Sequence, residues 1–476
     1  MASPTVAEPQ PHAVLVPIPA QGHITPFLRL ATLLLARGFH VTFVLTEYNA
    51  RRLERARGNH WTAAAGPSFR VETIPDGLPP PLQDQQDETQ DIPALCSSVR
   101  STCLAPFRDL MAHLGRAPDT PPVTSIVSDS GMGFTVDEDF GVPVFFFFTH
   151  SACGCWSYLH FPDLVSRGYT PLKDASCLSN GYLDTPIDWI PGLENLRLRD
   201  FPSFIRTTDP ADVLLNLSVR RASFDVTRSA GFIFNTFAAL EDPVLTAIRS
   251  KYPNLYAIGP LSSSSISSSL WKEDLECLRW LDAQPSSSVL YVNFGSIAVV
   301  SASQLAEFAC GLANSGHRFL WVVRPDLMRD GGAAAIVKEV AAKVGDWGSV
   351  VGWCDQQRVL AHPATAAFLS HCGWNSTIES VVEGRPMICW PFFAEQHTNC
   401  RFLCTRWRIG VEISGEVTRV EVERCVREVM ANEDLRRRAA EWKQKAREAV
   451  GPDGSSTADL DRLVVDLKPT KKRLPS

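Results

Sequence analysis

Short β-rich runs alternate with helical segments twice along this chain, and a serine tract separates the two series. The first series includes "AVLVPIP", "HVTFVLT", "VTSIVSD", "VPVFFFF" and "GFIFNTF". The second includes "SVLYVNFGS", "RFLWVVR", "GSVVGW", "TAAFLSH" and "PMICWP". Such alternation predicts parallel sheets flanked by helices. We therefore expect an α/β protein with two doubly wound, Rossmann-like domains that face each other across a cleft.

The length of 476 residues also favours two domains, because a single core rarely grows this large. We expect the first domain over residues 1–261, a Ser-rich linker over 262–270 and the second domain over 271–454. A helix within 455–476 is expected to pack back on the first domain. The best ligand site of such an arrangement is the cleft, at the carboxyl ends of the strands.

Composition excludes several classes of protein. The net charge is −6, whereas a surface that binds nucleic acid needs a basic excess. The 13 cysteines are scattered and form no Cys-x-x-Cys pair, which indicates reduced, mostly buried thiols in a cytosolic protein rather than a zinc or disulfide framework. No run of about 20 apolar residues occurs, so no membrane span is predicted. We expect a cytoplasmic monomer that binds only small molecules.

The stretch "SHCGWNST", residues 370–377, lies where an apolar strand turns into a helix. A helix N-terminus offers free N–H groups and a partial positive charge. Gly373 lets a ligand approach the backbone, and His371, Asn375 and Ser376 add donors. Together these features describe a cradle for a diphosphate. The alternative is that Asn375 or Ser376 merely caps the helix. A dinucleotide or ATP site is disfavoured, because the G-x-G-x-x-G and Walker lysine motifs are missing.

A second set of polar residues falls on the same predicted edge of the first domain. His23 follows the first strand, and Asp129 ends another. A carboxylate bonded to one imidazole nitrogen fixes the tautomer and leaves the other nitrogen as a base. Gly22 leaves room for a substrate beside it. The alternative is a structural histidine at a strand end, which is common when no such partner is present.

Residues 353–396 read "WCDQQRVLAHPATAAFLSHCGWNSTIESVVEGRPMICWPFFAEQ". This segment resembles the signature box of plant UDP-sugar-dependent glycosyltransferases of family 1. The stretches "IPAQGHITPFLRLA", "ACGCWSYLHF", "LDTPIDWIPGLENLRLRDFPSFIRTTDP" and "YVNFGSIAV" extend the resemblance over essentially the whole chain. The middle two point to the subgroup that contains cyanohydrin and terpenoid glucosyltransferases. The resemblance implies the GT-B fold, with acceptors bound by the first domain and the UDP-sugar by the second.

The resemblance also implies roles for individual positions of the second domain. Uracil and ribose would contact Trp353, the Cys354 backbone, Gln356 and Glu379. The diphosphate would contact His371, Gly373, Asn375 and Ser376, with help from Ser296. The hexose would contact Trp374, Glu395 and Gln396, and the terminal Gln favours glucose over galactose. Thr149 matches a residue that touches the sugar or the β-phosphate, although a plain strand-end hydroxyl is the alternative.

The implied activity is inverting transfer of glucose from UDP-glucose to a hydroxyl or carboxyl of a small lipophilic plant metabolite, giving a β-glucoside of secondary metabolism. His23 would act as general base, with Asp129 as its orienting partner. The N-terminus of the helix in "SHCGWNST" would stabilise the negative charge that develops on the leaving UDP, so no metal cofactor is expected. Two alternatives stay open: another UDP-sugar as donor, or a binding protein without turnover, against which the intact His23 and Asp129 argue.

The acceptor pocket is the least determined part of the sequence. The aromatic run "VFFFFTHSACGCWSYLHF" and the stretch "PSFIRTTDP" supply candidates, for which core packing is the alternative. The candidates are Gly22, His150, Trp156, Tyr158, His160 and Phe204. Three departures from the family pattern stand out. Asp355 replaces a usual Pro and predicts a looser loop near the uracil. The segment after Asp129 is about two residues short, which could shift that carboxylate. His150 stands beside Thr149 and could alter acceptor choice.

Overall fold

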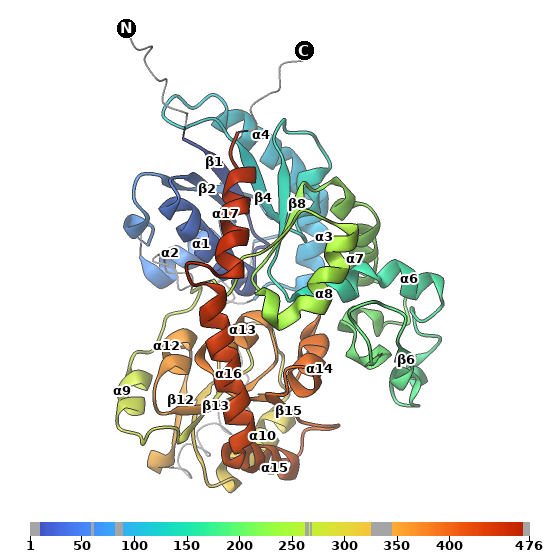
Figure 1. Cartoon of the computed structure of the whole chain (residues 1–476), viewed down its shortest axis with the longest axis vertical. Helices are drawn as coiled ribbons and strands as arrows, with labels where there is room; N and C mark the ends of the chain where they lie inside the picture. Colours follow the sequence, from blue (N-terminus) through green and yellow to red (C-terminus); the bar gives the residue numbers. More distant parts are fainter. Residues whose placement is uncertain are drawn as a thin grey trace.

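The computed structural model describes residues 10–58, 61–80, 89–261, 266, 269–324 and 345–469, and it contains two parallel sheets, one above the other in Figure 1. The first sheet has the order β3-β2-β1-β4-β5-β8-β9. Its strands are β1 (His12–Val16), β2 (His40–Thr46), β3 (Phe69–Ile74), β4 (Ser125–Asp129), β5 (Val144–Phe148), β8 (Gly231–Phe234) and β9 (Leu255–Ala257). Most of the predicted Ser-rich linker lies outside the described residues.

The second sheet has the order β12-β11-β10-β13-β14-β15 and is also parallel throughout. Its strands are β10 (Val289–Asn293), β11 (Arg318–Val322), β12 (Gly348–Val351), β13 (Thr365–Ser370), β14 (Met387–Cys389) and β15 (Gly410–Glu412). Strand order reverses between β1 and β4 in one sheet and between β10 and β13 in the other. In open α/β sheets such reversals mark the ligand-binding crevice. The predicted pair of Rossmann-like domains is confirmed.

Helices cover both faces of each sheet, so the central strands are buried throughout. Every residue of β1, β2, β4 and β5 is buried, as expected for parallel strands packed on two sides. The first domain has α1 (Gln21–Ala36), α2 (Glu47–Arg57), α3 (Ile92–Thr102), α4 (Leu104–Leu114), α5 (Ala152–Leu159), α6 (Phe161–Ser166), α7 (Val213–Ser223) and α8 (Ala238–Lys251). A short ribbon of β6 (Pro186–Ile187) and β7 (Leu196–Arg197) lies apart from the sheets.

The helices of the second half follow the same alternation. They are α9 (Glu276–Asp282), α10 (Ala302–Asn314), α12 (Gln356–Ala361), α13 (Trp374–Glu383), α14 (Gln396–Thr405), α15 (Arg419–Ala431), α16 (Glu433–Ala449) and α17 (Ser455–Asp466). A capping box begins α10: Ser301 Oγ accepts from Gln304 N at 3.2 Å, and Gln304 Oε1 accepts from Ser301 N at 3.1 Å.

The last two helices join the halves of the molecule. Figure 1 shows α16 beside the second domain and α17 against the first. Asp459 of α17 accepts a hydrogen bond from Ala257 N of β9 at 2.8 Å, and the Tyr256 hydroxyl donates to Asp466 at 2.5 Å. Leu460, Leu463, Val464 and Leu467 share a core with β1, β2 and α1. The final helix therefore completes the core of the first domain.

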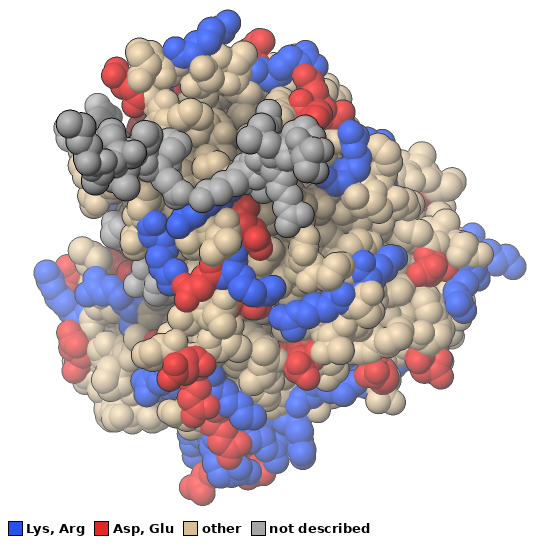
Figure 2. All heavy atoms as spheres, turned by 45° about the horizontal axis from the view of Figure 1, so that its top comes forward, with Lys and Arg blue, Asp and Glu red and all other residues tan. Residues whose placement is uncertain are grey.

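The surface and the cysteines agree with the composition. Figure 2 shows basic and acidic side chains interspersed over the face it presents, with no field of one sign. None of the described helices is long and apolar enough to cross a bilayer.

All 13 cysteines are free, and most are buried. Three of them are not scattered in space: the Sγ atoms of Cys372, Cys389 and Cys400 lie within 4.8 Å of one another behind β13 and β14.

Candidate functional site

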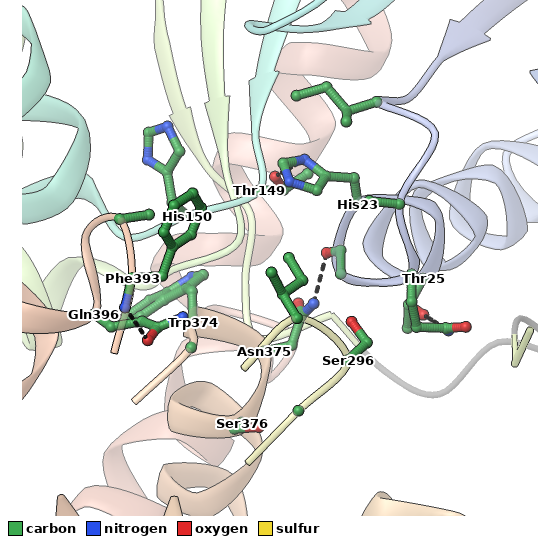
Figure 3. A pocket seen from close by; sticks show the side chains of 18 of the residues that line it. His23, Thr25, Thr149, His150, Ser296, Trp374, Asn375, Ser376, Phe393 and Gln396 are labelled. Carbon is green, nitrogen blue, oxygen red and sulfur yellow. Dashed lines mark hydrogen bonds between the residues drawn. The ribbon is translucent and has the colours of Figure 1, made fainter. Parts of the chain in front are cut away.

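A cavity of about 500 Å³ lies between the carboxyl edges of the two sheets. That size is typical of sites for small ligands. In Figure 3, His23 after β1 and Thr149 and His150 after β5 lie on its upper wall, and Ser296 after β10 and Asn375 after β13 lie on its lower wall. Asp129 and Ser130, at the end of β4, also line the cavity. The two points of strand-order reversal thus face each other, and the predicted residues of both domains meet in one place.

His23 and Asp129 form the pair that the sequence predicts. His23 Nδ1 lies 2.7 Å from Asp129 Oδ2, and the Thr149 hydroxyl oxygen lies 2.7 Å from the same nitrogen. The carboxylate is 2% exposed, whereas the imidazole is 27% exposed and opens to the cavity. A proton on Nδ1 donated to Asp129 leaves Nε2 as the nitrogen that can accept another. The Thr149 hydroxyl therefore contacts both members of this pair, since it also lies 3.4 Å from Asp129 Oδ2.

The short segment after Asp129 does not displace the carboxylate. The chain there forms only a 3₁₀ turn, Gly133–Val136, and Asp129 Oδ1 accepts from Gly131 N at 3.0 Å. Burial alone would raise the pKa of Asp129, but the charge and hydrogen bond of His23 and the Gly131 N–H outweigh burial and hold the pKa below its usual value. Asp129 is therefore ionised at neutral pH and can stabilise a protonated His23.

Helix α13 begins where the sequence predicts the diphosphate cradle. Its N-cap is Gly373, without a side-chain cap, so the alternative in which Asn375 or Ser376 caps the helix is wrong. The first N–H groups of α13 are left for a ligand. Asn375 instead donates across the cleft to Gly22 O at 2.7 Å, next to His23 (Figure 3). The two walls of the cavity thus touch between the proton acceptor and the cradle.

Two glycines make room for His371 in the cradle. A Cβ atom on Gly295 or Gly373 would lie 2.5 or 2.4 Å from the His371 ring, which real Cβ atoms cannot do. Gly295 also has φ of +74°, and Cys372 between His371 and Gly373 has φ of +63°. Left-handed backbone at a non-glycine residue stores strain that is typical of functional sites. Burial and the Arg324 charge lower the pKa of His371 to about 4, so the ring is a neutral hydrogen-bonding group.

A network of polar side chains from α12, α13 and α1 lines another part of the cavity. Gln356 Nε2 donates to Glu379 Oε2 at 2.7 Å and to Ser376 Oγ at 3.1 Å. Arg29 of α1 reaches from the first domain to Glu379 Oε1 at 2.5 Å, and both side chains are buried. Trp353 and Cys354 also line the cavity. The predicted uridine-binding residues are therefore brought together, with one partner, Arg29, that the sequence did not point to.

The residues predicted for the hexose lie where α14 begins. Gln396 Oε1 accepts from Phe392 N at 2.9 Å and from Phe393 N at 2.8 Å, so its NH₂ group faces the cavity (Figure 3). Burial raises the pKa of Glu395, which the nearby His23, Tyr158 and Arg221 partly oppose. Trp374 is 2% exposed and donates its indole N–H to Asn235 O at 2.9 Å. Its ring edge lines the cavity from a buried position.

Asp355 stabilises the local structure instead of loosening it. Its carboxylate accepts from Arg358 N at 3.2 Å and caps α12. Asp is among the best N-cap residues, because it satisfies an N–H group that the helix leaves free. The expectation of a looser loop at this position is therefore corrected. The backbone at this position is held by a helix cap.

The acceptor candidates divide into two groups. Gly22, His150 and Phe204 line the cavity. Trp156 and His160 do not: the Trp156 indole donates to Pro191 O at 2.9 Å, and His160 bonds Asp163 at 2.7 Å. The physical reason is the register of α5, on which residues 156 and 160 share one face while 154 and 158 share another that faces the cleft. The expectation that Trp156 and His160 reach the acceptor is corrected.

His150 is neutral and packed among aromatic rings. Its ring lies 5.4 Å from Phe148 and 5.5 Å from Tyr158 between centroids, and burial together with the Arg221 charge lowers its pKa to about 4. Its Nε2 atom is buried without a hydrogen-bond partner among the described residues. Tyr158, which the sequence named together with Trp156 and His160, also lines the cavity, and so does Arg221, which the sequence analysis did not select.

Comparison with known proteins agrees with this geometry. Residues 249–441 match the family described as UDP-glucoronosyl and UDP-glucosyl transferase. The chain is 49% identical to 7-deoxyloganetin glucosyltransferase of Gardenia jasminoides, over 95% of this chain and 97% of that one. It is 48% identical to (R)-mandelonitrile beta-glucosyltransferase of Prunus dulcis, over 97% and 98% of the two chains.

Among solved structures, Os79 from O. sativa in complex with UDP superposes with a TM-score of 0.79 at 27% identity, over 96% of this chain and 100% of the other. Both the fold and the full length are thus shared. The chain belongs to the plant UDP-sugar-dependent glycosyltransferases of family 1, and it has the GT-B fold of that family.

Proposed function

We propose that this glycosyltransferase transfers glucose from UDP-glucose, with inversion, to a hydroxyl or carboxyl of a small lipophilic metabolite. One observation carries the proposal: His23, paired with buried Asp129 at 2.7 Å, lines the same cavity as the uncapped N-terminus of α13. A proton acceptor from one domain and an anion site from the other are the two groups that glycosyl transfer from a nucleotide sugar requires.

The donor would lie along the second domain with its uridine at Trp353, Cys354, Gln356 and Glu379. Its diphosphate would lie on the α13 N-terminus, against Gly373 and Ser376, with His371, Asn375 and Ser296 beside it. Its hexose would contact Trp374, Glu395, Gln396 and Thr149. All of these residues line one cavity, which supports the assignment. The NH₂ group of Gln396, oriented by the two backbone N–H groups that its oxygen accepts, would donate to a sugar hydroxyl.

In the reaction, the acceptor oxygen attacks the anomeric carbon while His23 Nε2 takes its proton. The bond from that carbon to the UDP oxygen breaks, and the attack from the opposite side turns an α-linked donor into a β-glucoside. Asp129 stabilises the imidazolium that forms. The negative charge that grows on the UDP is met by the N–H groups and dipole of α13.

We propose that this dipole takes the place of a divalent cation. The support is the position of α13 at the diphosphate and the neutral polar character of the side chains around it. The measurement is the rate of UDP release before and after treatment with EDTA. An unchanged rate fits the proposal, and a rate restored only by added Mg²⁺ or Mn²⁺ contradicts it.

The decisive experiment is a screen of acceptors with labelled UDP-glucose, read by mass spectrometry. We expect products heavier by one hexose for some alcohols, phenols or acids. Parallel reactions with UDP-galactose and UDP-xylose test the donor, for which Gln396 supports glucose. Protein that binds UDP-glucose yet releases UDP with no acceptor and no water would instead be a binding protein.

Three further sequence expectations remain proposals: the domain limits 1–261 and 271–454, the cytoplasmic location and the monomeric state. The free cysteines support a reducing compartment. The contacts of α17 with β9 support the assignment of the final helix to the first domain. Light scattering on the purified protein measures the oligomeric state directly.

A further inference from the structure

The acceptor half of the cavity has a wall built from two helices. On α7, the residues that line it are Leu214, Leu217, Ser218 and Arg221, which are spaced three, four and seven apart and so share one helix face. On α3, they are Ile92, Leu95 and Cys96, spaced in the same way. This wall is apolar except for one full charge, the guanidinium of Arg221, and one hydroxyl.

Among the described residues Arg221 pairs directly with no carboxylate, although its charge acts at longer range on the buried Asp129 and Glu395. Among the described residues it makes no hydrogen bond and no ion pair, and its closest ring, Tyr158, has its centroid 6.0 Å from the guanidinium carbon. Its neighbour Arg220 is different, because it pairs with Asp137 at 3.1 Å and with Asp225 at 3.6 Å. The planar fork of a guanidinium matches a carboxylate, so Arg221 presents an anion-binding group to the cavity.

The charge lies close to the reacting groups. A Cβ atom on Gly131 would be 3.6 Å from Arg221 Nη2, and Gly131 N is the donor that holds Asp129 Oδ1. Arg221 therefore sits beside the loop that follows β4, near the His23–Asp129 pair but outside ion-pair distance of it. His23 and Arg221 line the same cavity.

We infer that the acceptor is a hydroxy acid whose carboxylate pairs with Arg221 while its hydroxyl lies at His23. The inference rests on the proposed function and narrows its substrate class. It also fixes the product. The hydroxyl oxygen bonds to the anomeric carbon, the bond to UDP breaks, the proton goes to His23, and the carboxylate stays free, so the product is an O-glucoside and not a glucose ester.

The test compares acids with neutral molecules of the same shape: mandelate with methyl mandelate, and 4-hydroxyphenylacetate with its methyl ester. We expect the wild type to prefer the acid of at least one pair by about tenfold or more in kcat/KM, since a charge-assisted bidentate contact is worth at least that factor. Arg221→Gln should remove the preference through KM, Arg221→Lys should keep part of it, and Arg220→Gln, the matched control, should keep all of it. Melting temperatures confirm that each variant is folded.

Several results would overturn the inference. Equal use of acid and ester by the wild type would do so. So would equal losses on both in Arg221→Gln, which would mean that the guanidinium acts through Asp129 or Glu395. A glucose ester as the product also contradicts it. If other neutral acceptors are glucosylated but neither acid is, the inference fails and the proposed function stands.

If nothing at all is glucosylated, the proposed function fails, and calorimetry then decides the inference separately. In that measurement mandelate is titrated into the UDP-bound protein. Binding that weakens about tenfold in Arg221→Gln but not in Arg220→Gln supports the carboxylate site. The absence of any difference between the variants overturns it.

Discussion

At the scale of single residues, His23 combines a fixed tautomer with an accessible second nitrogen. Replacing it by Ala removes the base but leaves every group of the cradle in place. We expect the turnover number to fall by roughly 10²–10⁴-fold, the usual worth of a positioned base, while the Kd for UDP stays nearly unchanged. Steady-state kinetics and calorimetry measure the two quantities. A His23→Ala protein with a near-normal rate would remove His23 from this role.

Gln396 allows a sharper test, because its side-chain oxygen and its NH₂ group have different roles. The oxygen accepts hydrogen bonds from the backbone, and the NH₂ group is proposed to donate to the sugar. Gln396→Glu keeps an oxygen for the N–H groups of Phe392 and Phe393 but loses the NH₂ donors. It should raise KM for UDP-glucose and leave the inhibition constant of UDP alone unchanged. Gln396→Ala loses both functions and should also loosen the loop before α14. If both ligands lose affinity equally in the Glu variant, the side chain is structural only.

The residues of the cavity differ in how well the sequence predicts their positions. His23 and Asp129 could be paired from sequence because both follow parallel strands, whose carboxyl ends share one edge. Trp156 and His160 could not be placed, since the start of α5 at Ala152 decides which face of the helix meets the cleft. Arg29 and Arg221 gave no signal, because a charged residue on a helix is usually solvated and only the folded cavity shows otherwise.

At the scale of elements, α12 depends on its cap. Asp355→Ala removes the acceptor for Arg358 N and should lower the free energy of unfolding by about 1 kcal/mol, whereas Asp355→Asn should retain most of the stability. Urea unfolding of the three proteins measures the difference. Equal stability of all three would mean that the loop is held by other contacts.

The elements themselves were largely predictable, because alternation, glycine stops and the Ser301 capping box are local signals. No local sequence signal specifies the order of the strands in the two sheets. That β1 pairs with β4 and β10 with β13 follows from right-handed crossover connections and from which helix covers which face. Contacts such as Trp374 with Asn235 depend on how the two domains meet, which no single segment encodes.

At the scale of the whole molecule, buried neutral histidines make stability depend on pH. His12, His150 and His371 each have a pKa lowered to about 4, chiefly by burial. In the unfolded chain they bind a proton near pH 6.5, whereas the folded protein binds it only near pH 4. Between these values the unfolded state holds more protons, so stability is full above pH 6.5 and is lost as the pH falls towards 4.

The measurement is the urea midpoint at pH values from 7.5 to 4. We expect the midpoint to fall across this range, and His150→Phe, which fits the aromatic surroundings of that ring, should make the decline shallower. His113 is exposed in the last turn of α4, and His113→Gln is the control that should leave the slope unchanged. A flat profile between pH 6.5 and 4 in the wild type would contradict the assignment.

The position of α17 has a consequence for how the protein is made. Leu460, Leu463, Val464 and Leu467 cover apolar side chains of β1, β2 and α1, which leave the ribosome more than 400 residues earlier. The nascent first domain must therefore wait, with part of its interior open to water, until translation is almost finished. During that interval we expect chaperones to bind it. A premature stop codon before α17 would leave this apolar surface permanently exposed to solvent.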